Sequence, residues 1–273
     1  MDNGIHFISG LPRAGSTLLA ALLAQNAALH AGMSSPVASL YTALRREMGA
    51  GNEFAVWIDD GQREAILRGL FDNYYHAIHP ARTVFDTNRI WCAHLPTLAA
   101  LFPQSRVIAC VRHVPWVIDS IESLIRRNLW QPSKMFEGDN MGTMWSRMEA
   151  LAAPGGPLGL AWNALKQAFF SNESARMMVL TYETLTSDPA RAMAAVYEFL
   201  GLAPFAHDFT RVAFDARDFD ARLGTPGLHT VRPTVGPVER PTILPPELWR
   251  RFEGDSFWRD PAQNPRGDRK SVV

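Results

Sequence analysis

The sequence is short of cysteine and of long apolar runs, and each shortage excludes a class of protein. Cys92 and Cys110 are the only cysteines and neither lies in a CxxC pair. This excludes a disulfide framework, and we expect two packed thiols in a reducing compartment. No stretch approaches about 18 consecutive apolar residues, so no membrane-spanning helix is predicted. The first ten residues, MDNGIHFISG, lack the basic and apolar regions of a signal peptide, so we expect a cytoplasmic protein.

Net charge is also lacking, because 27 basic residues balance 27 acidic ones. The chain therefore has no global field that would attract nucleic acid or a membrane, and neither is expected as a partner. It contains no HExxH, no GxSxG and no zinc-like Cys/His cluster, so no metal site is expected. Only three basic residues are lysines: Lys134, Lys166 and Lys270. Genome composition alone can produce that bias, but any anion site must then rely on arginine, whose planar fork suits phosphate and sulfate.

The sequence does contain short apolar runs that alternate with helical patterns, which predicts an α/β fold with a parallel sheet. The predicted strands cover residues 5–9, 82–86, 106–111 and 177–180. The predicted helices cover residues 16–28, 36–48, 62–76, 94–101, 116–126, 143–152, 160–170, 189–200 and 246–252. In such sheets, ligands bind outside the carboxyl ends of the strands.

The composition changes after Gly201 to proline, arginine and aromatic residues. We expect a single domain over residues 1–260, in which residues 201–245 form a C-terminal covering segment. The polar tail at 261–273 is predicted to be disordered.

The stretch GLPRAGSTLL, residues 10–19, has the spacing of a phosphate loop between a strand and a helix. Gly10 and Gly15 are five apart, yet Ser16 stands where a nucleoside triphosphatase has lysine. Arg13 is the only cation in the loop, and a lone guanidinium in apolar surroundings requires an anion. A triphosphate needs the lysine, whereas a less charged 5′ group can be bound by amides, hydroxyls and one arginine. The alternative is a glycine turn that only joins strand to helix.

A second candidate anion element begins where the run RVIACV ends in Arg112. Ser120 follows eight residues later on the next predicted helix. An arginine at a strand end and a hydroxyl on the following helix can share one phosphate. The alternative is a surface arginine and a helix serine that are unrelated.

These segments together resemble sulfotransferases that use 3′-phosphoadenosine 5′-phosphosulfate (PAPS), and the loop is closest to that of tyrosylprotein sulfotransferases. VRHVPWVIDS resembles the family's 3′-phosphate element, LTYETLTSDPARAMAAVYEFLGL a later segment beside the adenine, and TVRPTVGPV the element that closes over the nucleotide. The resemblance implies a P-loop-type three-layer fold with a central parallel sheet flanked by helices. It implies PAPS as donor, adenosine 3′,5′-bisphosphate (PAP) as product, and no metal. The implied donor-binding residues are Pro12, Arg13, Ala14, Gly15, Ser16, Thr17, Arg112, Ser120, Tyr182 and Arg232.

The resemblance also nominates catalytic residues, with a gap at the general base. Arg13 and Arg89 are expected to stabilise charge, Arg89 from about the place of a catalytic lysine. The two positions that carry the family's bases hold Ser34 and a residue near Asn88. Asp86 is the first substitute, although it is at least as well explained as a structural partner. Ser34 is retained as a residue that orients the acceptor or the sulfuryl group, and Glu47 and His30 are weaker candidates for the base.

The sequence leaves other functions open. One is a P-loop phosphotransferase or kinase with a degenerate Walker A loop, and another is a non-catalytic nucleotide-binding module. The acceptor is expected to carry a hydroxyl, on a peptide tyrosine or phenol, a glycan or a small molecule. Neither the acceptor nor the oligomeric state is predicted more narrowly.

Overall fold

A central sheet of five parallel strands organises the computed structural model, which describes residues 4–78, 82–128, 130 and 142–263. Its order is β2-β3-β1-β4-β5. The strands are β1 (Ile5–Gly10), β2 (Leu29–Ala31), β3 (Thr83–Thr87), β4 (Val107–Val111) and β5 (Met177–Thr181). All residues of β1 and β4 are buried, as expected for parallel strands with both faces covered. The predicted three-layer α/β fold is confirmed.

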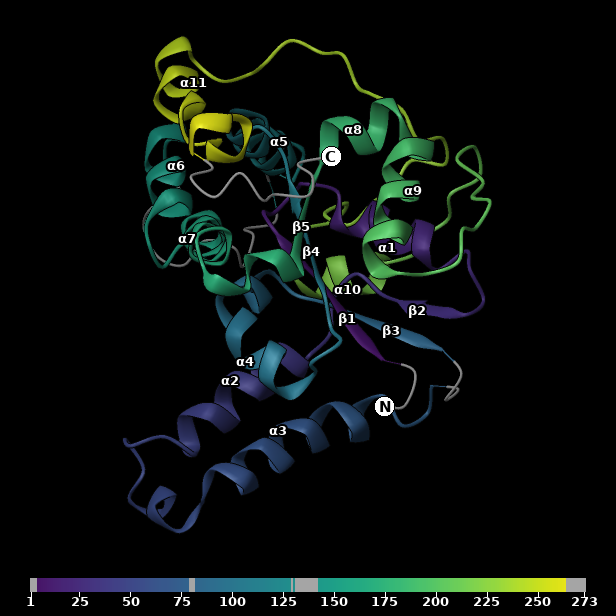
Figure 1. Cartoon of the computed structure of the whole chain (residues 1–273). Coiled ribbons are helices and arrows are strands. Elements are labelled where there is room, and N and C mark those ends of the chain that lie inside the picture. Colours follow the sequence, from purple (N-terminus) through teal and green to yellow (C-terminus); the bar gives the residue numbers. More distant parts are fainter. Residues whose placement is uncertain (1–3, 79–81, 129, 131–141, 264–273) are drawn as a thin grey trace.

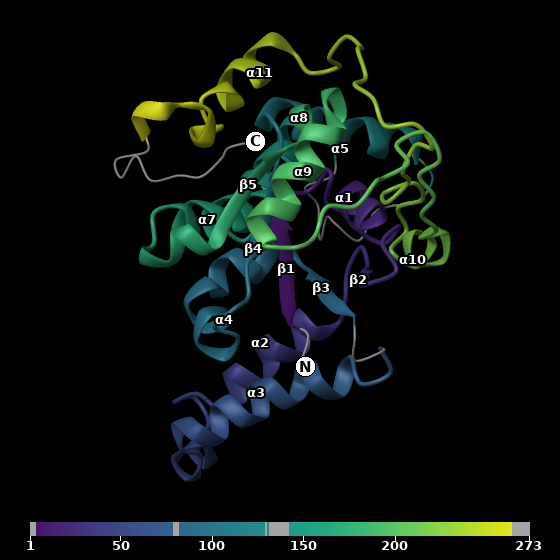
Figure 2. The ribbon, with the colours of Figure 1, turned by 45° about the vertical axis from the view of Figure 1, so that its right-hand side comes forward.

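Helices cover both faces of this sheet (Figure 1). The helices are α1 (Ser16–Leu23), α2 (Val37–Glu47), α3 (Asp60–Tyr74), α4 (Leu95–Leu101), α5 (Val114–Arg127), α6 (Met144–Ala152), α7 (Pro157–Phe169), α8 (Tyr182–Ser187), α9 (Pro189–Leu200), α10 (Arg217–Arg222) and α11 (Pro246–Glu253). Helices α1, α8 and α9 lie on one side of the sheet, and α4 and α7 on the other (Figure 2). Helices α2 and α3 form an arm that projects from the body.

An aromatic cluster joins this arm to the sheet. Phe7 of β1 and Trp91, which follows β3, have ring centroids 5.3 Å apart. Tyr41 of α2 and Phe71 of α3 pack against Trp91 at 5.5 Å and 5.8 Å. All four side chains are fully buried. Aromatic pairs of this geometry add roughly 0.5–1.5 kcal/mol each beyond area burial, so the base of the arm is held firmly.

The main differences from the sequence-based expectations are one helix end, one strand and two short α-helices. The helix predicted over residues 16–28 ends at Leu23, because the chain turns back to form β2, which was not predicted. Gln25 in that turn exchanges side-chain hydrogen bonds with the backbone of Asp208. The short helices α8 and α10 were also not predicted. Most of the tail predicted to be disordered, from residue 264 onward, lies outside the described residues.

Candidate functional site

The loop between β1 and α1 turns through three residues with positive φ, Gly10 (105°), Arg13 (57°) and Gly15 (92°). A Cβ on Gly10 would lie 2.1 Å from the carbonyl oxygen of Cys110 in β4, so only glycine permits this approach. Within the described ranges, Arg13 is the only non-glycine residue with positive φ. Such backbone strain persists only where the surroundings enforce it, and it concentrates at functional sites.

The N-terminus of α1 faces the end of β1 without a side-chain cap. Gly15 is the N-cap residue, and no acidic residue occupies the first turn. The amides of the first turn have no intrahelical acceptor, and the helix dipole is positive there. Loop and helix therefore present a ready-made site for an anion.

The guanidinium of Arg13 joins this loop to two distant segments. Its Nε donates to Oγ of Ser120 in α5 at 3.1 Å, and its Nη1 donates to the carbonyl of Leu228. Burial lowers the pKa of Arg13 to about 10, and the nearby charges of Arg112 and Arg127 add to this effect. Positively charged groups that lie this close together favour the binding of an anion between them.

Arg112 and Tyr182 lie side by side because the strands that precede them are paired. Val111 of β4 is in register with Thr181 of β5, so each following residue emerges at the same edge. The guanidinium carbon of Arg112 lies 4.4 Å from the centroid of the Tyr182 ring, a cation–π contact. Burial lowers the pKa of Arg112. The structure thus brings together four predicted donor-site residues, Arg13, Arg112, Ser120 and Tyr182.

Arg89 follows β3 in a short 3₁₀ helix, Arg89–His94, that is fastened to β1. Ser9 donates its hydroxyl to the Arg89 carbonyl at 2.9 Å and accepts from the Cys92 amide at 3.2 Å. The Arg89 side chain is exposed, yet the surrounding protein lowers its pKa.

Asp86 is fully buried beneath this surface and accepts three hydrogen bonds. The donors are Ser35 Oγ and Tyr75 Oη, each at 2.6 Å, and Trp91 Nε1 at 2.7 Å. Burial raises the pKa of Asp86, and the three donors oppose that rise. These contacts tie β3 to the arm and favour a structural role. Ser34, by contrast, is exposed.

The covering segment, residues 201–245, is anchored to α5 by the fully buried Asp119. This carboxylate accepts from Arg240, from Thr242 Oγ1 at 2.7 Å and from the amide of Ile243 at 2.8 Å. Arg232 from the same segment is exposed and donates to the Gly236 carbonyl, so none of its described contacts joins it to the Arg13 cluster.

A sequence model of the sulfotransferase family matches residues 6–207, which include the loop, β4, the start of α5 and Tyr182. The chain belongs to the sulfotransferase family. No curated protein sequence matches it.

Solved structures show the same fold for this sulfotransferase. A sulfotransferase domain from the curacin biosynthetic pathway is 20% identical with a TM-score of 0.51, over 74% of this chain and 75% of that one. A sulfotransferase from Alicyclobacillus acidocaldarius is 15% identical with a TM-score of 0.50, over 81% and 89% of the two chains. Matches with such low sequence identity show only that the fold is shared.

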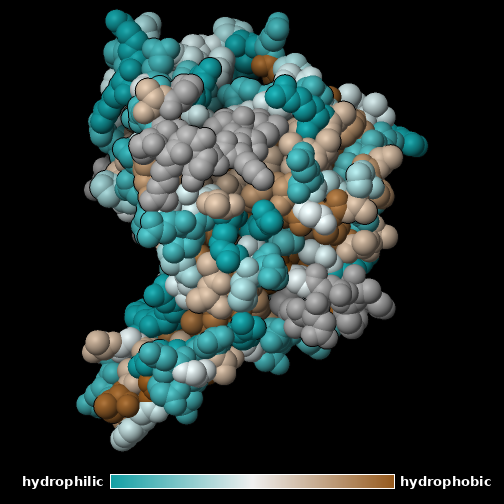
Figure 3. Space-filling view, viewed as in Figure 1, coloured by the Kyte–Doolittle hydropathy of each residue, from teal (hydrophilic) through white to brown (hydrophobic). Residues whose placement is uncertain are grey.

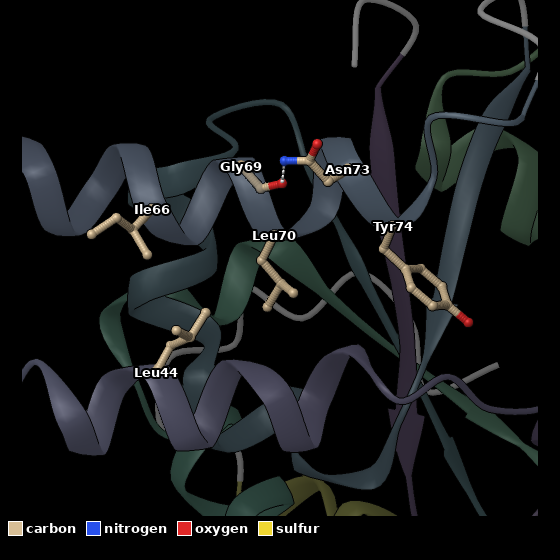
Figure 4. A pocket seen from close by; sticks show the side chains of 6 residues that line it. All are labelled: Leu44, Ile66, Gly69, Leu70, Asn73 and Tyr74. Atoms are coloured by element: carbon tan, nitrogen blue, oxygen red, sulfur yellow. Dashed lines mark hydrogen bonds between the residues drawn. The ribbon is translucent and has the colours of Figure 1, made fainter.

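Two surface pockets border the arm of the sulfotransferase, which Figure 3 shows separated from the body by a hollow. One, of about 400 Å³, is lined by Ala38, Ser39, Thr42, Ala43, Arg46, Asn88 and Ile90, of which the last two flank Arg89 in the sequence. The other, of about 510 Å³, lies between α2 and α3 (Figure 4) and is lined by Leu44, Ile66, Gly69, Leu70, Asn73 and Tyr74. Only the first is lined by the immediate sequence neighbours of a predicted catalytic residue.

Sequence reasoning missed Asp119 and the pair formed by Asp220 and His229. Asp119 stands next to Ser120 on α5, and a charged residue within an apolar helix face was a usable signal. No signal pointed to the pairing of Asp220 with His229, which depends on how a proline-containing turn folds. In the described part of the chain, no group of three metal-ligating side chains converges, and no helix is long and apolar enough to cross a membrane.

Proposed function

We propose that this sulfotransferase takes its sulfuryl group from PAPS and transfers it to a hydroxyl acceptor. The supporting observation is the convergence on Arg13. Its guanidinium bonds Ser120 and lies within electrostatic range of Arg112. The cluster contains two guanidinium groups whose pKa is lowered by burial, beside an uncapped helix N-terminus. This chemistry fits a ligand with two separate anionic groups.

In the proposed complex, the loop from Pro12 to Thr17 holds the 5′ end of the donor. The Ser16 and Thr17 hydroxyls and the first-turn amides of α1 donate to its oxygens. Arg112 and Ser120 hold the 3′-phosphate, Tyr182 lies beside the adenine, and Arg232 closes over the nucleotide. Bound PAPS supplies an activated sulfuryl group on a good leaving group. Arg13 and Arg89 stabilise the negative charge that develops at the reacting centre.

We place the acceptor in the pocket of about 400 Å³ whose lining includes Asn88 and Ile90, the sequence neighbours of Arg89. Its lining combines apolar side chains with the Ser39 and Thr42 hydroxyls, which suits a hydroxylated organic molecule. An Ala43→Trp variant fills this pocket while leaving the donor cluster intact. We expect it to lower transfer from PAPS to 2-naphthol, a test phenol, with unchanged affinity for PAP. Equal transfer by this variant and the wild type would contradict the placement.

Calorimetric titration with PAP, without metal and beside ATP, tests the donor. We expect a dissociation constant on the order of 1 µM for PAP and much weaker binding of ATP. Arg13→Ala and Arg112→Ala should each weaken PAP binding roughly 10- to 100-fold, because each removes charge-assisted hydrogen bonds. Arg191→Ala is the matched control, since Arg191 is an exposed arginine on α9. Metal-dependent ATP binding with no response to PAP would instead support a phosphotransferase.

A further inference from the structure

A carboxylate and an imidazole form a buried pair in the covering segment, beyond the residues that match the family. Asp220 of α10 is 2% exposed. It accepts from the His229 backbone amide at 2.9 Å, and its other oxygen lies 2.5 Å from His229 Nδ1. A carboxylate placed against Nδ1 fixes the tautomer, so that the neutral ring carries its lone pair on Nε2.

The packing around His229 leaves Nε2 open. No described residue forms a hydrogen bond with this nitrogen, and 19% of the side chain is accessible. The ring of Phe219 packs against the imidazole at 5.5 Å between centroids. The Thr225 amide donates to the Asp220 carbonyl at 2.9 Å, which closes the turn over residues 224–229. The ring is therefore held in one orientation with one free basic nitrogen.

This turn lies against the Arg13 cluster. The Leu228 carbonyl, one residue before His229, accepts from the Arg13 guanidinium. Asn128, the C-cap residue of α5, donates its side-chain amide to the Pro226 carbonyl at 3.1 Å, which seats the turn beside the helix that carries Ser120. The Arg13 guanidinium that contacts this turn also lies within electrostatic range of Asp220 from α10, and of Arg112, Arg127 and Tyr182.

The residues first considered as bases are less suited to that task. The Asp86 carboxylate is buried and already accepts three donors. Glu47 is paired with Arg46 at the surface of the arm. His30 packs against Tyr75, and burial lowers its pKa. None of these three has a described contact with the Arg13 cluster.

We propose that His229 is the general base of the transfer reaction and that Asp220 is its positioning residue. This inference rests on the proposed function. The proton of the acceptor hydroxyl moves to Nε2 of His229 as the acceptor oxygen forms its bond to sulfur. The bond between sulfur and the bridging oxygen of PAPS breaks, and its electron pair leaves on the phosphate of PAP. Asp220 stabilises the imidazolium that results.

The test compares His229→Gln and Asp220→Asn with His76→Gln, a matched control at an exposed histidine near the end of α3. The assay follows PAP release from PAPS, with water or 2-naphthol as acceptor. We expect His229→Gln to slow release about 100-fold or more, and Asp220→Asn by a smaller factor. The acidic limb of the pH–rate profile should disappear in His229→Gln. Imidazole added to His229→Ala should restore part of the rate.

Two measurements separate this inference from the proposed function. Calorimetry should show that His229→Gln binds PAP as the wild type does, which also verifies that it folds. Nitrogen-15 NMR of labelled histidine should show Nδ1–H of His229 in the wild type and a loss of that preference in Asp220→Asn. If the wild type releases PAP and His229→Gln retains its rate, His229 is not the base and the donor assignment stands. If the wild type fails to bind PAP, both proposals fall.

Discussion

Gly15→Ala is expected to disturb the site through Tyr182, and Gly4 offers a control with nearly the same backbone angle. Gly15 has φ of 92° and Gly4 has φ of 90°. A Cβ on Gly15 would lie 3.0 Å from Cδ2 of Tyr182 and 3.4 Å from Cδ2 of Leu185. A Cβ on Gly4 would meet no atom within 4 Å. The two substitutions therefore both place a side chain at positive φ, and they differ in the contact with Tyr182.

The conformational cost of a side chain in this left-handed region is about 1–2 kcal/mol, so both variants should lose that much stability. For a chain of this size, this corresponds to a fall in Tm of roughly 2–8 °C. Gly15→Ala should lose about 1 kcal/mol more, because the Tyr182 ring must move by a few tenths of an ångström. Since that ring supports the Arg112 guanidinium, we expect PAP binding about tenfold weaker, a change of about 1.4 kcal/mol.

Thermal unfolding and PAP calorimetry on both variants provide the measurement. The expected pattern is a similar loss of stability with normal PAP affinity in Gly4→Ala, and a larger loss with weaker binding in Gly15→Ala. If both variants lose the same stability and bind PAP as the wild type does, the close approach of Gly15 to Tyr182 does not support the nucleotide site.

Three further predictions concern stability and reactivity. Asp119→Ala should lose about 3–5 kcal/mol of unfolding free energy in urea and speed tryptic cleavage within the covering segment, because the buried carboxylate that holds Arg240 is removed; unchanged cleavage would contradict the anchoring role. Burial and the neighbouring Arg106 lower the pKa of His6 to about 4, below its ordinary value of 6.5. As the pH falls, His6 is therefore protonated in the unfolded chain before it is protonated in the folded protein. The free energy of unfolding decreases as the pH falls from 6.5 towards 4, and the loss between pH 7 and pH 5 is about 2 kcal/mol. Urea titrations of His6→Gln should show a smaller decline, and an equal one would be evidence against this origin. Burial raises the pKa of Cys92 to about 11 and that of Cys110 further still. Neither thiol should therefore react with a disulfide reagent until urea unfolds the protein. Rapid labelling of the native protein would show that the thiols are not buried.

Short apolar runs predicted four of the five strands, because a strand buried on both faces needs no polar alternation. The three-residue β2 was missed, since its pairing with β3 comes from tertiary contacts rather than from its own composition. The helix predicted to continue to residue 28 is rich in alanine, but contacts of Gln25 and Asn26 with distant residues end it earlier. Helix propensity predicts helix ends only weakly, and tertiary contacts of this kind override it.

The loop arginine, Arg112 and Ser120 could be nominated from the sequence because each follows a strand or lies on the helix after it, whereas Tyr182 was nominated only by the resemblance to sulfotransferases. The sequence did not predict what Asp86 contacts, since its donors Ser35, Tyr75 and Trp91 come from three separate segments. The carboxylate at a strand end suggested a catalytic base, and its depth below the surface was not readable from the sequence.

The contact between Arg13 and Leu228 has a consequence for synthesis of the chain on the ribosome. The two residues are 215 positions apart, and Gly10 in the same loop packs against Cys110. A protein is synthesised from its N-terminus, so the loop is translated before the segments that it contacts. Its backbone can be fixed only after β4 has been synthesised, and Arg13 gains all its partners only after the covering segment has been synthesised. Such long-range closure is slow and exposes unpaired strand edges meanwhile. A nascent chain that stalls before residue 228 would therefore expose an incomplete anion site, and chaperone dependence should fall only once residue 228 has emerged from the ribosome.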